Sequence, residues 1–235
     1  MRSYATDAES APNFAQQKLS QLKRLIEMTS QKEDPLNIII TGVGGQGNVV
    51  ASHIFASAAV RDGFYVSVGE TYGAAQRGGA VMSHIRLSRE NDYGPLIPEG
   101  RAHIILGFEP VESLRTIGSF GNNKTKAIVN PRPVYSIDVL SGMSKYPSVD
   151  EVLKAIKELV HSVQMVEATE LAKKAGDPIM QNVVMVGCLA GSGFTHVKVE
   201  TFREVIMETF AKKRPEANLE AFELGLKEIK RTKSL

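Results

Sequence analysis

The sequence predicts an α/β fold: a Rossmann-like, doubly wound, mostly parallel sheet with additional C-terminal helices and an N-terminal helical extension. Short runs of β-branched and other apolar residues alternate along the chain with amphipathic stretches of helical spacing. The first apolar run, residues 38–40, leads directly into a glycine-rich loop and a helix-compatible segment. Such alternation is typical of parallel sheets whose helices cover both faces. We therefore divide the chain into a helical extension, residues 1–35, and one domain, residues 36–235.

Composition is that of an ordinary globular protein. Of 235 residues, 43% are apolar and 23% charged, and the formal net charge is +2. This near-neutral balance argues against nucleic acid or an anionic membrane surface as a partner. No apolar run approaches the roughly 18 residues that a membrane span needs, and the first residues lack the apolar segment of a secretory signal. We therefore expect a cytoplasmic protein.

The chain has one cysteine, Cys188, inside the apolar run 179–191. One thiol cannot by itself form a disulfide, a four-cysteine zinc site or an iron–sulfur cluster. Apolar surroundings favour a packing role for Cys188 over a nucleophilic one. The histidines show no metal-ligand spacing, so we expect no metal held by this chain alone.

The extension carries apolar residues at roughly helical spacing among glutamines and lysines, which predicts an amphipathic helix. These residues are Phe14, Leu19, Leu22, Leu25, Ile26 and Met28. Pro35 and the two acids before it end the pattern. The helix could dock on its own domain or on a partner subunit.

Residues 36–47, LNIIITGVGGQG, predict a buried strand and a tight turn into a helix that starts near Gln46. The glycines match G-x-G-x-x-G with one to spare: Gly42, Gly44, Gly45 and Gly47. Without Cβ atoms, the backbone can turn sharply and a phosphate can approach its N–H groups. The helix N-terminus would add its positive dipole end. The loop therefore predicts an anion site, with a ligand-free turn as the alternative.

A dinucleotide is one candidate ligand. Residues 49–60 predict a helix on a sheet, and residues 64–68 predict a second strand. Glu70 stands 23 residues beyond Gly47, where a dinucleotide-binding unit places the acid for a ribose hydroxyl. This spacing favours a stand-alone NAD- or FAD-binding oxidoreductase as an alternative function.

Residues 71–79, TYGAAQRGG, predict a small-residue loop. Arg77 beside Gly78 and Gly79 could lay its guanidinium against a phosphate or carboxylate without obstruction. The alternative is a turn with an exposed arginine. Residues 80–88 alternate with the period of a strand, which places His84 at the strand surface.

The rest of the chain predicts further strands and helices. The strands are expected at residues 102–108, 126–130 and 163–166; the helices at 109–117, 148–160, 168–175, 179–191, 201–213 and 219–229. Ser148 and Thr201, each with a glutamate three residues later, predict capping boxes. Asn182 is the polar exception in the apolar run 179–191 and needs partners if it is buried. No hydrolase triad or H-E-x-x-H motif occurs, so the sequence offers few candidate residues for catalysis by this chain alone.

Taken together, several segments resemble the gamma subunit, or gamma domain, of the 2-oxoacid:ferredoxin oxidoreductases. They are residues 42–47 (GVGGQG), 70–79 (ETYGAAQRGG), 95–100 (PLIPEG), 107–110 (GFEP) and 182–187 (NVVMVG). The resemblance spans about residues 36–230, and the form AAQRGG is closest to the indolepyruvate branch, whose beta subunit is this gamma-type chain. Tyr72 and Asn48 depart from the pattern of that branch.

The resemblance implies a non-autonomous subunit of an enzyme that oxidatively decarboxylates a 2-oxoacid, aryl in this branch, with coenzyme A to acyl-CoA and CO2. Thiamine diphosphate, Mg²⁺ and [4Fe–4S] clusters would sit in alpha- and beta-type partner subunits, with electrons leaving to ferredoxin or a similar acceptor. The gamma-type chain would close over the active site and share in binding coenzyme A.

The resemblance also implies roles for individual residues. The loop residues Gly44, Gly45, Gln46 and Gly47 would contact an anion. Arg77, Gly78 and Gly79 would contact a coenzyme A phosphate or the neighbouring subunit. The remaining residues expected at this cofactor site are Glu70, Thr71, Tyr72 and Gln76. A scaffold whose glycine loop binds nothing is the third reading.

Overall fold

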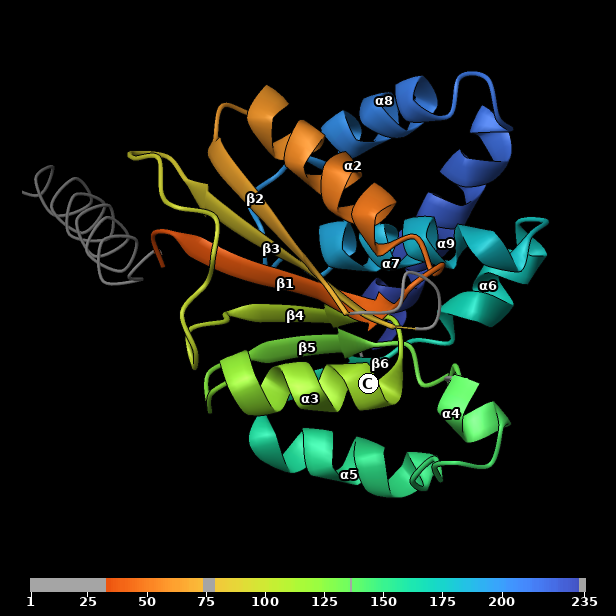
Figure 1. The fold of residues 1–235 in the computed structure, drawn as a ribbon. Helices are drawn as coiled ribbons and strands as arrows, with labels where there is room; N and C mark the ends of the chain where they lie inside the picture. Colours follow the sequence, from red (N-terminus) through yellow and green to blue (C-terminus); the bar gives the residue numbers. More distant parts are fainter. Residues whose placement is uncertain (1–32, 74–78, 136, 233–235) are drawn as a thin grey trace, which may run out of the picture. The chain divides into compact units, whose positions relative to one another are not determined.

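The structure is a computed structural model and describes residues 33–73, 79–135 and 137–232. Asp34–Leu235 forms one compact unit around a sheet that has six strands within the described residues (Figure 1). The strands are β1 (Leu36–Val43), β2 (Tyr65–Tyr72), β3 (Ala80–Ser88), β4 (Ile104–Gly107), β5 (Lys126–Val129) and β6 (Ser162–Met165). The helix predicted for the extension lies outside the described residues.

The helices of this unit alternate with the strands except between β2, β3 and β4, which follow one another without an intervening helix, contrary to the predicted alternation. They are α2 (Asn48–Arg61), α3 (Pro110–Phe120), α4 (Ile137–Leu140), α5 (Val149–Leu159), α6 (Ala168–Lys174), α7 (Gln181–Gly191), α8 (Val199–Thr209) and α9 (Pro215–Thr232). A short 3-10 helix, η1 (Pro178–Met180), precedes α7, so the apolar run 179–191 forms two elements where one was predicted.

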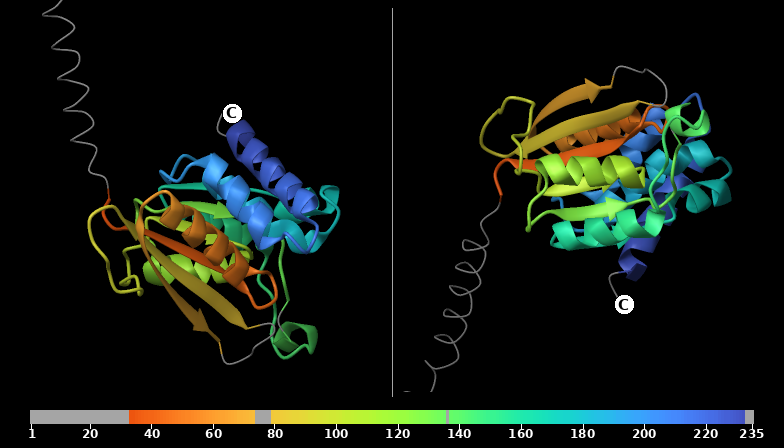
Figure 2. Two further views of the ribbon diagram at one scale, coloured as in Figure 1. Left: turned by 90° about the horizontal axis from the view of Figure 1, so that it is seen from above. Right: turned by 60° about the horizontal axis from the view of Figure 1, so that its bottom comes forward.

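The sheet has a parallel core and an antiparallel edge. Its strand order is β2-β3-β1-β4-β5-β6. Strands β1, β4, β5 and β6 pair in parallel, whereas β3 pairs antiparallel with both β1 and β2. Figure 2 shows β2 as the outermost strand on this edge. The predicted mostly parallel, doubly wound sheet is confirmed.

The two faces of the sheet bury different sets of helices. Because successive side chains of a strand point to opposite faces, Ile38 and Ile40 of β1 join one apolar cluster and Ile39 joins the other. The first cluster includes side chains of α2, α7, α8 and α9, and the second includes side chains of α3 and α5. Figure 1 shows these helices on opposite sides of the sheet.

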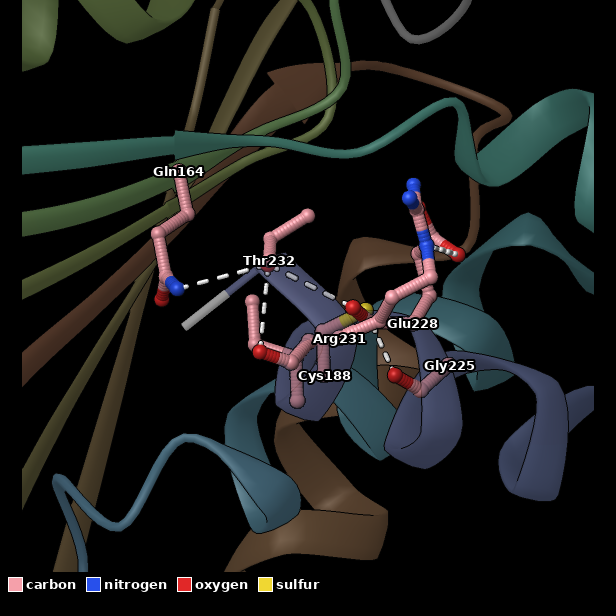
Figure 3. Close-up of polar contacts among 7 residues, drawn as sticks. Gln164, Cys188, Gly225, Glu228, Arg231 and Thr232 are labelled. Carbon is pink, nitrogen blue, oxygen red and sulfur yellow. Dashed lines mark hydrogen bonds and ion pairs between the residues drawn. The ribbon is translucent and has the colours of Figure 1, made fainter. Parts of the chain in front are cut away.

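Helix α9 packs closely on α7 through glycine. A Cβ added to Gly225 would lie 2.0 Å from the carbonyl oxygen of Val184. The Cys188 thiol is buried in this contact and donates to the carbonyl of Gly225 at 3.4 Å (Figure 3). Burial raises the pKa of the Cys188 thiol. The predicted packing role of Cys188 is confirmed.

Three local predictions are wrong, and for Thr201 and His84 a tertiary contact overrides the local pattern. Helix α5 begins after Ser148, but the Ser148 side chain makes no capping hydrogen bond. Helix α8 begins at Val199, before Thr201, and Thr201 donates instead to Asp62 at 2.7 Å. His84, expected at the strand surface, is only 3% exposed.

Candidate functional site

The glycine loop joins the end of β1 to the start of α2. Gly45 has φ 102° and Gly47 has φ 82°, conformations that side chains other than glycine rarely adopt. Helix α2 begins at Asn48, two residues later than the sequence predicts. Gly47 is its N-cap and carries no side chain to cap it. The loop therefore forms the sharp turn that the glycine pattern predicts.

The buried side chain of Gln46 fixes the position of this loop through two hydrogen bonds. Its side chain is 5% exposed. Its Oε1 accepts from the backbone N–H of Val43 at 2.7 Å, and its Nε2 donates to the carbonyl of Phe108 at 2.9 Å. The two ends of the amide thus connect β1 to the residue after β4, which leaves Gln46 a positioning role in the loop.

Asn182, in the first turn of α7, is hydrogen-bonded to the glycine loop. Its Nδ2 donates to the carbonyl of Gly47 at 3.4 Å, and its Oδ1 accepts from the N–H of Val183 at 2.9 Å. The expectation that a buried Asn182 has partners is confirmed. Its contact with the loop was not predicted. A single polar residue in an apolar helix was the only sequence signal for it.

Several backbone N–H groups of the loop remain available. The N–H of Gly44 donates to the carbonyl of Gly79 at 2.8 Å, and that of Gln46 donates to Val43. Within the described residues, no hydrogen bond is formed by the N–H groups of Gly45, Gly47 or Asn48. The first N–H groups of any helix lack intrahelical partners and attract anions. Of the expected site residues 44–47, Gly45 and Gly47 therefore offer donors to a potential anion cradle, together with Asn48, whereas the N–H groups of Gly44 and Gln46 are already bonded.

A cavity of about 660 Å³ lies beside the cradle. Its walls combine loop backbone with mostly apolar side chains: Val43, Gly44, Gly45, Gly47, Asn48, Val49, Val50, Tyr72, Gly73 and Val81. None of these wall residues carries a formal charge at neutral pH. Asn48 donates through Nδ2 to the carbonyl of Val81 at 3.3 Å, while its buried Oδ1 has no partner within the described residues. The cavity can hold an apolar chain beside a set of hydrogen-bond donors.

Glu70 and Tyr72 lie together near the mouth of this cavity. The Tyr72 hydroxyl donates to the Glu70 carboxylate, and this hydrogen bond raises the pKa of Tyr72. The other Glu70 oxygen lies 3.7 Å from His53 Nε2 and accepts from Ser52 at 3.4 Å, both on α2. Thr71 lines an adjoining cavity of about 280 Å³ beside α3, which shares Tyr72, Gly73 and Val81 with the glycine-loop cavity.

The other expected contacts come from residues 76–79. Gln76, Arg77 and Gly78 lie outside the described residues. Gly79 is described, and its carbonyl accepts from the N–H of Gly44. The end of this segment is therefore attached to the glycine loop.

The strand order bears on the dinucleotide alternative. A dinucleotide-binding unit places its ribose acid on the strand adjacent to the glycine-loop strand. Here β3 lies between β1 and β2, so Glu70 stands one strand further from the loop. Its carboxylate is also occupied by three neighbouring side chains. This arrangement gives the spacing of Glu70 and Gly47 no support as a dinucleotide signature.

Metal and membrane features were also sought. Within the described residues, no group of three or more histidine, cysteine, aspartate or glutamate side chains could hold a metal ion. In the same part of the chain, every helix is too short or too polar to cross a bilayer.

Comparison with known proteins identifies the family. Residues 37–228 match the family described as Pyruvate ferredoxin/flavodoxin oxidoreductase. The chain belongs to this family. Two relatives are named Indolepyruvate oxidoreductase subunit IorB. The one from Archaeoglobus fulgidus is 41% identical, over 81% of this chain and 93% of its own length. The one from Thermococcus kodakarensis is 40% identical, over 83% of this chain and 96% of its own length. The family resemblance read from the sequence is confirmed.

Solved structures show the same oxidoreductase fold. The gamma subunit of a keto/oxoacid ferredoxin oxidoreductase from Geobacter sulfurreducens PCA superposes with a TM-score of 0.60 at 21% identity, over 83% of this chain and 98% of its own. A 2-oxoglutarate:ferredoxin oxidoreductase from Magnetococcus marinus, with 2-oxoglutarate, coenzyme A and succinyl-CoA bound, superposes with a TM-score of 0.66 at 22% identity. That match covers 85% of this chain and 32% of the other.

Proposed function

We propose that this chain is the gamma-type subunit of a thiamine diphosphate-dependent complex that oxidatively decarboxylates an aryl 2-oxoacid. The products are the acyl-CoA thioester and CO2, and two electrons pass to ferredoxin or a similar acceptor. The identity to proteins named as indolepyruvate oxidoreductase subunits supports the substrate class. In this proposal the chain contributes to coenzyme A binding and to closure of the active site.

The proposal assigns the redox and thiamine chemistry to alpha- and beta-type partner subunits. The one thiol of this chain, Cys188, is buried between α7 and α9, so it cannot ligate a cluster without disrupting that packing. The described residues also offer no acidic or histidine cluster for Mg²⁺. These observations support a division of labour in which thiamine diphosphate, Mg²⁺ and [4Fe–4S] clusters belong to the partners.

Coenzyme A fits the glycine-loop cavity in its chemistry. The N–H groups of Gly45, Gly47 and Asn48 could donate to its anionic or carbonyl oxygens. The walls at Val43, Val50 and the intervening backbone suit the apolar parts of its pantetheine arm. When bound, coenzyme A supplies the thiol that accepts the acyl group. These available donors beside an apolar cavity are the observation that carries the proposed role.

The test uses the reconstituted complex with Gly45→Ala in this chain. Nothing lies within 4 Å of a Cβ added to Gly45, so the methyl group would stand in the cradle and not in the protein. We expect the KM for coenzyme A to rise at least about fivefold, since the anion loses its close approach to the backbone. Gly176→Ala is the matched control, because Gly176 has φ 117° and an equally open Cβ position away from the cavity.

The outcomes separate the parts of the proposal. An equal KM for coenzyme A in both variants would contradict the role of the cradle. Turnover of a 2-oxoacid by the isolated chain would contradict the subunit assignment. The substrate class is tested by assaying the complex with arylpyruvates, arylglyoxylates and branched-chain 2-oxoacids. We expect the highest kcat/KM for an arylpyruvate, and a preference for a branched-chain acid would contradict that part.

A further inference from the structure

A second cavity, of about 320 Å³, lies past the end of β5. Its polar lining is Arg132, Thr169 and Gln181, and its apolar wall includes Pro133, Val134 and Ile179. It shares no lining residue with the glycine-loop cavity. Neither the sequence patterns nor the proposed function uses these residues.

The polar lining rests on a buried hydrogen-bond network. Asn130, the residue after β5, is completely buried. Its Nδ2 donates to Thr169 Oγ1 at 3.1 Å and to Gln181 Oε1 at 3.2 Å. The Thr169 hydroxyl, which is also buried, donates to Gln181 Oε1 at 2.7 Å. Two donors therefore meet at one end of the Gln181 amide.

This network fixes the orientation of Gln181. Asn130 Nδ2 also lies 3.5 Å from the carbonyl oxygen of Phe108, which can only accept, so this end of Asn130 is assigned as the nitrogen and the end of Gln181 that faces it as the carbonyl oxygen. The amide nitrogen Nε2 then faces away from the network. It forms no hydrogen bond within the part of the chain that the structure describes, and Gln181 lines the cavity. The cavity is thus supplied with an oriented N–H donor.

Arg132 is the positively charged residue in the lining of this cavity. Its side chain is exposed at the cavity and makes no ion pair within the described residues. The pKa of Glu170 is lowered first by its hydrogen bond with Lys173, and the charge of Arg132 contributes less to this shift. Glu170 already pairs with Lys173 at 2.7 Å. The Arg132 guanidinium is therefore available to a ligand.

We infer that this cavity binds a small carboxylate that carries an apolar substituent. Arg132 and Gln181 Nε2 donate to the carboxylate oxygens, and Pro133, Val134 and Ile179 contact the apolar substituent. One guanidinium and one amide suit a singly charged, planar anion. The volume is at the low end of the range for small-molecule sites. This site is separate from the proposed coenzyme A site.

Phenylacetate and phenylacetamide test this assignment, because they share a shape and differ in charge. Each is titrated into the full-length chain by isothermal titration calorimetry. We expect phenylacetate to bind with one site per chain and phenylacetamide to bind at least tenfold more weakly. No heat from phenylacetate at millimolar concentration, or equal affinity for both compounds, would overturn the proposal.

Two variants locate the binding. Arg132→Gln removes the charge from an exposed side chain, and we expect the Kd for phenylacetate to rise at least tenfold. Gln181→Glu keeps oxygens that can accept from Thr169 and Asn130, but replaces the donor with a negative charge, so binding should be lost. Arg231→Gln, on α9, is the matched control with unchanged affinity. Unchanged affinity in both Arg132→Gln and Gln181→Glu would overturn the assignment.

Because this test measures binding to the chain and not turnover of a complex, its failure would leave the proposed function untouched. Failure of the coenzyme A test would likewise leave this site untouched. A melting curve followed by circular dichroism checks that Gln181→Glu is folded before it is titrated.

Discussion

The two faces of the sheet differ in which elements glycine brings together. On the face of α2, α7, α8 and α9, glycines bring the backbones of two helices into contact, as at Gly187 and Gly225 between α7 and α9. On the face of α3 and α5, the close approach is between a strand and a helix, because a Cβ added to Gly107 of β4 would lie 1.9 Å from Ser113 Oγ of α3. The second face holds a smaller apolar cluster and the buried His84.

The glycine loop contacts the face of the sheet that α7 covers. Asn182 of α7 donates to the carbonyl of Gly47, so the loop is hydrogen-bonded to the same helix that packs against α9. A Cβ on Gly47 would lie 2.5 Å from the Asn182 amide nitrogen, whereas one on Gly45 would meet nothing. The two glycines of this motif thus have different roles. Gly47 is needed for packing against Asn182, and Gly45 leaves space for a ligand.

The largest effect is expected for Gly225→Ala at the contact between α7 and α9. The new methyl group would collide with the backbone of Val184, which cannot rotate away. We expect the free energy of unfolding to fall by about 3 kcal/mol, as for overpacked cores. Urea titration monitored by circular dichroism measures it.

Gly118→Ala on α3 is the matched control for Gly225→Ala. Its methyl group has space, and alanine favours a helix. Its stability should be unchanged or rise by up to about 1 kcal/mol. Equal losses in the two variants would show that the collision with Val184 does not determine the cost of Gly225→Ala.

A smaller effect is expected for Gly47→Ala, which tests whether the loop depends on α7. Gly63, in the turn after α2, is the control because its φ is 81° and its Cβ position is open. Gly63→Ala should cost about 1 kcal/mol from the left-handed conformation alone. Gly47→Ala should cost about 1 kcal/mol more, because Asn182 must also move.

Asn182→Ala resolves the origin of that extra cost. In the Asn182→Ala background, Gly47→Ala should cost no more than Gly63→Ala, which a double-mutant cycle in urea would measure. An extra cost that survives the removal of Asn182 would show that the contact with α7 does not explain it.

Local patterns predicted the parallel core of the sheet but not its edge. Helices pack on both faces of the parallel strands, so these strands consist of continuous apolar runs such as residues 38–40. Their composition alone is enough to predict them as buried strands. The position of β3 between β1 and β2 depends on pairing between distant segments, which no local pattern encodes. Likewise, the N-terminus of α8 is bonded by Asp62, far away in the sequence, instead of by a local capping box.

The same contrast holds for the candidate site. The glycine spacing predicted the left-handed turns at Gly45 and Gly47, because only glycine adopts them readily. It did not predict that Gln46 would turn inward to the carbonyl of Phe108, or that Asn182 would support Gly47. Both contacts join residues more than 60 positions apart. The functions of Gln76, Arg77 and Gly78 stay predictions.

The smallest effect is expected on the α3 face, at His84 of β3. Its Nδ1 accepts from the N–H of Ile97 at 3.3 Å, and its ring packs edge-on against Phe120. Burial lowers the pKa of His84 below its ordinary value of about 6.5. The unfolded chain therefore binds a proton at a higher pH than the folded chain does. The stability that neutral His84 permits is complete above about pH 6.5 and is lost as the pH falls through the lower pKa of the folded state.

His84→Gln measures this contribution. Glutamine can still accept from Ile97 but does not titrate, so the part of the pH dependence due to His84 should disappear between pH 7 and pH 5. Urea titrations at several pH values would show a shallower decline for His84→Gln than for the native chain. His196→Gln, at an exposed histidine, is the control and should keep the native slope. A native slope in His84→Gln would contradict the contribution of buried His84 to the pH dependence of stability.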